Sequence, residues 1–149
     1  VPGVRIPLSP LLKRKGNLAI PFFLCLIANA LYLQRSDYGE RESVSAEIAF
    51  SNLIENNCKY SADKSSFIQI SYWDKWTIVR LSDAGIGMSE ADKQHLFTLF
   101  YRGEQEKMAE GHGIGMTLSQ KIIHLHQGNI SVHSEQGKGT TFVIELPHI

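Results

Sequence analysis

The sequence predicts an α+β domain in which helices cover one face of a mainly antiparallel sheet. Two runs rich in β-branched and aromatic residues, 66–73 and 75–82, are separated by a single residue, as in a β-hairpin. Two further segments typical of strands, 129–134 and 140–146, flank a glycine-rich turn and predict a second hairpin. Segments with helical spacing stand before and between the hairpins without strict alternation, and this order favours α+β over a parallel α/β sheet.

The first forty residues are the least informative part of the chain. Their apolar run from Leu18 to Leu33 has 16 residues, fewer than the about 20 that cross a bilayer, and it contains Pro21 and Asn29. A secretory signal peptide is disfavoured because the run begins well inside the chain. Two alternatives stay open: a strand or helix that packs on the domain, and a segment that is poorly ordered or non-native. We therefore divide the chain into residues 1–40, of uncertain status, and a domain at 41–149.

A helix of roughly four to five turns is predicted just after this boundary. Ser43 or Ser45 can cap its start, and apolar side chains then recur at helical spacing up to Lys59. These apolar positions are Ile48, Ala49, Leu53 and Ile54.

Beyond the first hairpin, a loop precedes a second helical segment. Residues 83–89 are glycine-rich, and helical spacing resumes from Glu90 to Phe100. The stretch 102–111 carries charges of both signs without an apolar period, so a mobile loop is expected there.

A third helix is expected at residues 116–126. Leu118, Ile122 and Leu125 fall on one face of this helix, which we expect to be the buried face. Gly128 stands where a left-handed residue commonly ends a helix.

Composition and charge are those of an ordinary globular domain. The chain has 149 residues, 43% of them hydrophobic and 20% charged, so one domain with its own core is expected. Fifteen basic residues balance 15 acidic ones, and this zero net charge argues against a nucleic-acid partner. Cys25 and Cys58 lack metal-ligand spacing, and we interpret them as small buried side chains in a reducing compartment.

Four short clusters carry candidate chemistry, and the first lies on the first helix. Asn52 and Asn56 are four residues apart, so both amides project from one face. A neutral oxygen donor there can help to hold Mg²⁺, which prefers few protein ligands besides water and phosphate oxygens. Lys59 adds a point charge for phosphate and Tyr60 a flat aromatic face. Taken alone, this pattern is more typical of a solvated polar helix face.

The second cluster, Asp83-Ala84-Gly85-Ile86-Gly87, directly follows a strand. Its glycines let the backbone approach a planar ligand closely, and the Asp83 carboxylate can accept a hydrogen bond from an exocyclic amine such as that of adenine. The third cluster, 96–102, contains three aromatic residues that are expected in the core, but Arg102 at its end stands at the head of the polar loop.

The fourth cluster, Gly111-His112-Gly113-Ile114-Gly115, opens the last helix, where free N–H groups and the helix dipole favour an anion. A dinucleotide fingerprint is excluded because no βαβ unit surrounds these glycines. A P-loop is excluded because Gly115 is followed by Met116-Thr117 and not by lysine with serine or threonine.

In this order, the four clusters resemble the N, G1, F and G2 boxes of the family that joins gyrase, Hsp90, histidine kinases and MutL. The resemblance covers residues from about Ala46 to Pro147 and implies a Bergerat-type two-layer sandwich, with a mixed, mainly antiparallel sheet and helices on one face. The family's usual strand and helix before the N box have no recognisable counterpart in residues 1–40.

The resemblance also implies a site for ATP and Mg²⁺ under a flexible lid at 101–113. Asn56 would bind Mg²⁺, while other residues would contact the nucleotide. The residues expected near the phosphates are Asn52, Lys59 and Arg102, and those around the base are Tyr60, Asp83, Gly85 and Gly87. Lid backbone would come from Gly111, Gly113 and Gly115, and Thr141 would support Asp83 through hydrogen bonds.

One position decides between branches of this family. The ATPase members carry a glutamate four residues before the Mg²⁺ asparagine, where it activates water, and this chain has Asn52 there. The resemblance therefore implies a bacterial sensor histidine kinase domain that keeps the γ-phosphate for a protein acceptor. A same-fold ATPase and a degenerate scaffold domain without nucleotide remain the alternatives.

Further expectations concern the whole protein. A separate dimerisation domain would carry the acceptor histidine, because no histidine here stands in an acceptor context, and this fragment is not expected to autophosphorylate alone. A response regulator would be the next partner. The full protein is expected to be tethered to the inner membrane, with this domain in the cytoplasm.

Overall fold

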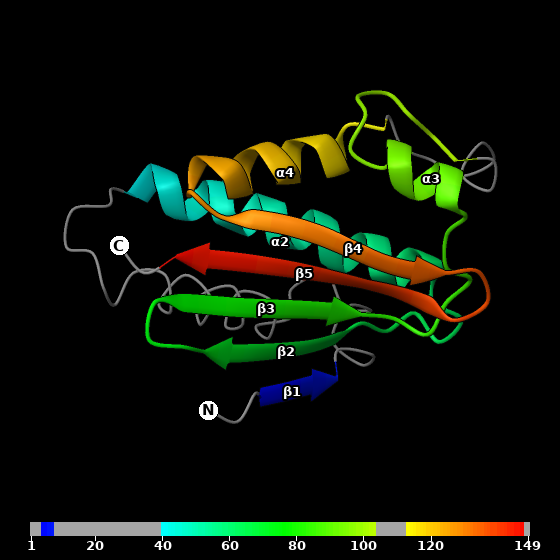
Figure 1. Ribbon diagram of the computed structural model, residues 1–149, viewed down its shortest axis with the longest axis horizontal. Helices are drawn as coiled ribbons and strands as arrows, with labels where there is room; N and C mark the ends of the chain where they lie inside the picture. Colours follow the sequence, from blue (N-terminus) through cyan, green and yellow to red (C-terminus); the bar gives the residue numbers. More distant parts are fainter. Residues whose placement is uncertain (1–3, 8–39, 104–112, 148–149) are drawn as a thin grey trace.

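Helices and sheet form two layers in the computed structural model, which describes residues 4–7, 40–103 and 113–147 (Figure 1). The five strands of the sheet have the order β1-β2-β3-β5-β4, and every pairing is antiparallel. The expected α+β sandwich is thereby confirmed. The elements are β1 (Val4–Pro7), α2 (Glu40–Tyr60), β2 (Phe67–Tyr72), β3 (Trp76–Ser82), α3 (Glu90–His95), α4 (Gly115–Leu125), β4 (Asn129–Glu135) and β5 (Gly139–Pro147).

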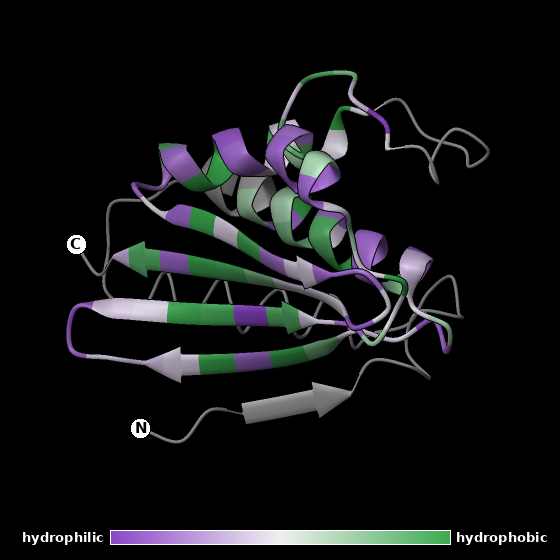
Figure 2. Ribbon diagram, turned by 45° about the vertical axis from the view of Figure 1, so that its right-hand side comes forward, coloured by the Kyte–Doolittle hydropathy of each residue, from purple (hydrophilic) through white to green (hydrophobic). Residues whose placement is uncertain are grey.

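The core lies between α2 and the central strands. Ile70, Val79 and Ile144 are cross-strand neighbours in register, and each is at most 2% exposed. Leu53 of α2 is fully buried in the same cluster. Burying one such side chain stabilises the fold by about 1.5–3 kcal/mol. Figure 2 shows hydrophobic segments in the middle of these strands and along the helices.

Helix α2 begins earlier than the sequence predicted. It starts at Glu40, so Ser43 and Ser45 lie within it and do not cap its start. Hydrophobic periodicity could not detect this additional turn, because residues 40–45 contain a single apolar residue, Val44.

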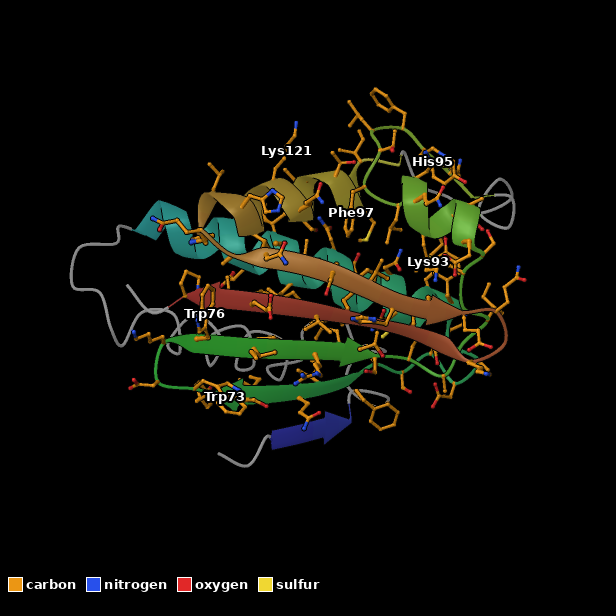
Figure 3. All side chains as sticks on the ribbon, in the orientation of Figure 1. Trp73, Trp76, Lys93, His95, Phe97 and Lys121 are labelled. Atoms are coloured by element: carbon orange, nitrogen blue, oxygen red, sulfur yellow. The ribbon has the colours of Figure 1, made fainter. Side chains whose placement is uncertain are left out.

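Helix α3 ends sooner than expected, at His95 and not at Phe100. The Thr98 N–H donates to the His95 carbonyl, and Phe100 adopts a left-handed φ of 62°. Leu96 and Phe97 still pack against the core, and Phe97 lies beneath the start of α4 (Figure 3). Phe100 is 66% exposed, so the expectation that the aromatic residues of 96–102 lie in the core is wrong for this residue. The apolar spacing came from a turn and not from a longer helix.

Helix α4 matches its expected range but buries a different face. Ile122 and Ile123 are 6% and 2% exposed, whereas Leu118 and Leu125 are 40% and 80% exposed. The face is set by α2, because the Ser119 hydroxyl donates to the Ala49 carbonyl at 3.2 Å. The expected face of Leu118, Ile122 and Leu125 is thus wrong for two of its three members.

The end of α4 also differs from the prediction at Gly128. The left-handed residue is Gln127, with φ of 58°. The Gln127 and Gly128 N–H groups donate to the His124 and Ile123 carbonyls, both at 2.9 Å, as in a Schellman motif. Gly128 is needed for space instead, since a Cβ there would lie 2.7 Å from the Glu145 carbonyl oxygen.

Near the amino terminus, β1 pairs with β2 over Val4–Pro7. The sequence of these four residues predicts no element, because so short a segment has no detectable period. The apolar run 18–33 lies outside the described residues. In the part of the chain that is described, no helix has both the length and the apolar content to cross a membrane.

Candidate functional site

A cavity of about 430 Å³ opens between α2, the loop after β3 and the start of α4. Its volume is within the range of small-molecule binding sites. Nine of the twelve expected site residues line it: Asn52, Asn56, Lys59, Tyr60, Asp83, Gly87, Arg102, Gly113 and Gly115. Of the other three, Gly85 and Thr141 are not among the lining residues, and Gly111 lies outside the described residues, as does most of the expected lid.

One wall comes from a single face of α2. Asn52 and Asn56 both line the cavity, as their spacing of four residues predicts. The Asn52 amide nitrogen lies 3.5 Å from the Gly115 carbonyl oxygen and so faces the start of α4. One turn further, the Lys59 ammonium lies 5.1 Å from the centre of the Tyr60 ring. This wall therefore offers amide oxygens, one cation and one aromatic face.

Asp83 follows the end of β3 and is half-buried. Its Oδ1 accepts hydrogen bonds from the Gly85 N–H at 2.8 Å and the Thr140 N–H at 3.3 Å. Burial raises the pKa of Asp83 above the ordinary aspartate value, and these two backbone donors oppose the rise. Among the described residues, both bonds to the carboxylate fall on Oδ1, so Oδ2 is available to a ligand that donates a hydrogen bond.

Gly85 and Gly87 hold the loop after β3 against its neighbours. A Cβ at Gly85 would collide with the Tyr60 carbonyl oxygen at the end of α2, and one at Gly87 would collide with the Glu135 carbonyl oxygen of β4. The Gly137 N–H also donates to the Ile86 carbonyl at 2.7 Å. The loop is therefore fixed on both sides, and of its two glycines Gly87 lines the cavity whereas Gly85 does not.

Thr141 does not have the expected role of supporting Asp83. Its hydroxyl pairs with the Ser82 hydroxyl at 3.0 Å, while Thr140 donates its N–H to Asp83. Side chains alternate along β5, and Thr141 is the register partner of Ser82. Thr141 and Ser82 thus share one face of the sheet, and Asp83 and Thr140 belong to the other.

A further part of the cavity wall is formed by the start of α4. Its N-cap residue, Ile114, makes no side-chain hydrogen bond to the helix. The first N–H groups of the helix therefore keep their capacity to bind an anion. Arg102 lines the same region together with Gly113 and Gly115.

Twelve lining residues were not assigned to the site from the sequence. They are Glu55, Ile86, Met88, Ser89, Asp92, Leu96, Tyr101, Gly103, Ile114, Met116, Gln136 and Thr140. Thr140 could have been found by alternation once the register of β3 and β5 was assigned. Glu55 lies between two assigned residues of α2, and its place on the cavity wall could have been tested by helical geometry.

Comparison with known proteins identifies relatives of this chain. A family model described as "Histidine kinase-, DNA gyrase B-, and HSP90-like ATPase" matches residues 42–149. Sensor histidine kinase YclK of Bacillus subtilis is 30% identical over 99 residues, which are 64% of this chain and 21% of that protein. Signal transduction histidine-protein kinase ArlS of Staphylococcus aureus is 37% identical over 101 residues, 66% of this chain and 22% of that protein.

The fold also has a match among solved structures. Mycobacterial sensor histidine kinase MprB superposes with a TM-score of 0.66 at 18% identity, and the match covers 97% of each chain. At this identity the comparison supports a shared fold and nothing further. This chain spans about a fifth of the length of the curated relatives named above.

Proposed function

Because this chain belongs to the family of histidine kinase-, DNA gyrase B- and HSP90-like ATPases, we propose that it is the ATP-binding catalytic domain of a sensor histidine kinase. One observation carries the proposal: a single cavity is lined both by a carboxylate that can accept from a base amine and by an uncapped helix start that can bind phosphates. The carboxylate matches the amine of the base, and the helix start matches the phosphates. The residues present therefore fit ATP.

At the base end, Asp83 would accept a hydrogen bond from the exocyclic amine of adenine. Its carboxylate is oriented for this by the Gly85 and Thr140 N–H groups, which occupy Oδ1. Tyr60 supplies an aromatic face to the same cavity from the end of α2. A base that carries a carbonyl in place of the amine would meet the carboxylate without a donor, so adenine is favoured over guanine.

At the phosphate end, the N–H groups at the start of α4 would bind phosphate oxygens. Arg102 and Lys59 add positive charge to the same cavity. Asn56 offers a neutral oxygen of the kind that Mg²⁺ accepts beside phosphate and water oxygens. Mg²⁺ bound there would neutralise charge on the phosphate groups.

The wall beside the phosphates favours transfer to a protein over hydrolysis. Asn52 has no capacity to take a proton from water, and its amide nitrogen is turned to the Gly115 carbonyl. The domain would therefore position the γ-phosphate and leave the nucleophile to a histidine on a separate dimerisation domain.

Hydrolysis is the second candidate function because Glu55 also lines the cavity. Its carboxylate could act as a base for water in place of the missing glutamate. Replacement of Glu55 by Gln separates the two readings, since release of inorganic phosphate would fall only if Glu55 activates water.

The remaining partners and the location of the protein belong to the same proposal. A response regulator would receive the phosphate from the dimerisation domain. The full protein would be tethered to the inner membrane with this domain in the cytoplasm, as its relatives are sensor kinases by name.

Calorimetric titration of the chain with a non-hydrolysable ATP analogue, with and without Mg²⁺, tests the nucleotide site. Asp83→Ala should weaken binding roughly 10- to 100-fold, since a hydrogen bond to a charged group contributes about 1.5–3 kcal/mol. Asn56→Ala should abolish the Mg²⁺ dependence. Thr141→Val is the matched control because its hydroxyl lies outside the cavity. Absence of binding by a folded wild type would overturn the proposal.

A further inference from the structure

Asp92 of α3 lines the cavity, but its carboxylate is already engaged within the protein. Oδ2 accepts a hydrogen bond from the Ser89 hydroxyl at 2.8 Å, and Oδ1 accepts one from the Tyr101 hydroxyl at 2.8 Å. Both bonds lower the pKa of Asp92 and keep it ionised at neutral pH. An ionised and occupied carboxylate beside a phosphate site is better suited to hold protein groups than to bind the nucleotide.

The residue that Asp92 holds is also fixed through its backbone. The Tyr101 N–H donates to the Thr98 carbonyl at 3.1 Å, and the neighbouring Phe100 N–H donates to the Gly113 carbonyl at 3.0 Å. The Tyr101 ring lies 5.1 Å from the ring of His95, the last residue of α3 (labelled in Figure 3). Tyr101 is therefore connected both to α3 and to the segment that enters α4.

Gly103 approaches the same carboxylate from the other side of Arg102. A Cβ added at Gly103 would lie 2.8 Å from Asp92 Oδ1, so the main chain at 103 passes directly over this oxygen. The residue before Arg102 thus bonds to Asp92, and the residue after it lies close to the same carboxylate. Both approaches hold the backbone beside Arg102 near Asp92.

We propose that Asp92 is a positioning residue for Arg102, acting through the hydroxyl of Tyr101. The inference rests on the proposed function, in which Arg102 adds positive charge beside the phosphates, and it assigns to Arg102 the contact with the terminal phosphate. Asp92 acts on the nucleotide indirectly. It fixes where the guanidinium of Arg102 can reach, and Arg102 makes the contact. A purely structural role in capping α3 would use only the Ser89 side of the carboxylate.

The preference for an ATP analogue over ADP is the quantity that separates these roles. Loss of a helix cap or of stability would change the affinities for both nucleotides alike, whereas misplacement of Arg102 would change only the affinity for the nucleotide with a third phosphate. Calorimetry on the full chain gives both dissociation constants, and their ratio is the measured preference.

Tyr101→Phe should lower this preference by about 10- to 100-fold, the range for one hydrogen bond to a charged group. Asp92→Ala should do the same, and Asp92→Asn should retain most of the preference because its amide oxygen still accepts from Tyr101. In an Arg102→Ala background, Tyr101→Phe should have no further effect. Tyr72→Phe, on β2 away from the cavity, is the matched control for removal of a hydroxyl.

Two outcomes would overturn the inference. If Tyr101→Phe keeps the wild-type preference while Arg102→Ala loses it, Asp92 does not act through Tyr101. Additive effects of Tyr101→Phe and Arg102→Ala would show that the two residues act independently. If the folded wild type binds neither nucleotide, the proposed function itself is wrong, and this result is distinct from the other two.

Discussion

Replacement of Gly87 by alanine tests how the loop after β3 is held against the end of β4. Gly87 has a φ of 66°, in the left-handed region, and a Cβ there would collide with the Glu135 carbonyl oxygen. The carbonyl belongs to the main chain and cannot rotate away, so the loop itself must move. Because Gly87 also lines the cavity, the movement should affect both stability and nucleotide binding.

Two contributions give the expected size of the effect. The left-handed conformation costs an alanine about 1–2 kcal/mol, and overpacking against a rigid neighbour costs typically 1–3 kcal/mol more. Gly87→Ala should therefore lower the free energy of unfolding by about 2–5 kcal/mol. Gly137 is the matched control, because it has a φ of 78° but no heavy atom within 4 Å of the added Cβ. Gly137→Ala should lose only the conformational part, about 1–2 kcal/mol.

Urea unfolding followed by circular dichroism measures both losses, and calorimetry with an ATP analogue measures the affinity of each variant. Trp73 and Trp76 lie at the end of the sheet away from α3 (Figure 3), so fluorescence from these residues reports on a region remote from the cavity. Equal losses of stability in the two variants would refute the reasoning, since the close approach to Glu135 would then contribute nothing. Unchanged affinity in Gly87→Ala would refute the link between loop position and binding.

Three further predictions address the site and the core. Burial raises the pKa of Asp83, so its ionised form destabilises the free domain above that pKa and has no such effect below the ordinary value near 4. Asp83→Asn should therefore have a higher melting temperature than wild type at pH 7, and this difference should close as the pH falls toward 4. The variant should also bind the ATP analogue more weakly. A difference in melting temperature that does not change with pH would contradict the prediction. Thr141→Val should lower the free energy of unfolding by about 0.5–1.5 kcal/mol and leave nucleotide affinity unchanged, whereas a loss of affinity would restore its expected role beside Asp83. Ile123→Ala should cost about 2–5 kcal/mol in urea unfolding and Leu125→Ala less than about 0.5, and similar losses would contradict the observed face of α4.

Local patterns predicted most of the sheet. Both hairpins could be assigned because alternating apolar residues identify strands and their turns are short. The buried face of α4 could not, since Leu118, Ile122 and Ile123 are all compatible with a helical stripe. The choice among them depends on the contact of Ser119 with α2, which is 70 residues away in the chain.

The candidate site could be predicted where the motifs themselves carry the geometry. Asn52 and Asn56 share a face because of helical spacing, and Asp83 is placed by the end of β3. Asp92 was missed because its contact with Tyr101 depends on the turn that ends α3. The helical spacing up to Phe100 did not predict this turn. Thr141 was misassigned because its role came from the family motif and not from the strand register.

Transfer of the γ-phosphate is the most direct test of the proposed kinase activity. The chain would be incubated with γ-labelled Mg-ATP and a separate dimerisation domain that carries an acceptor histidine. We predict label on that domain that is stable in alkali and labile in acid, as for phosphohistidine, and absent when its histidine is replaced or when this chain carries Asp83→Ala. Rapid release of labelled inorganic phosphate without labelling of the acceptor would contradict the account and favour hydrolysis.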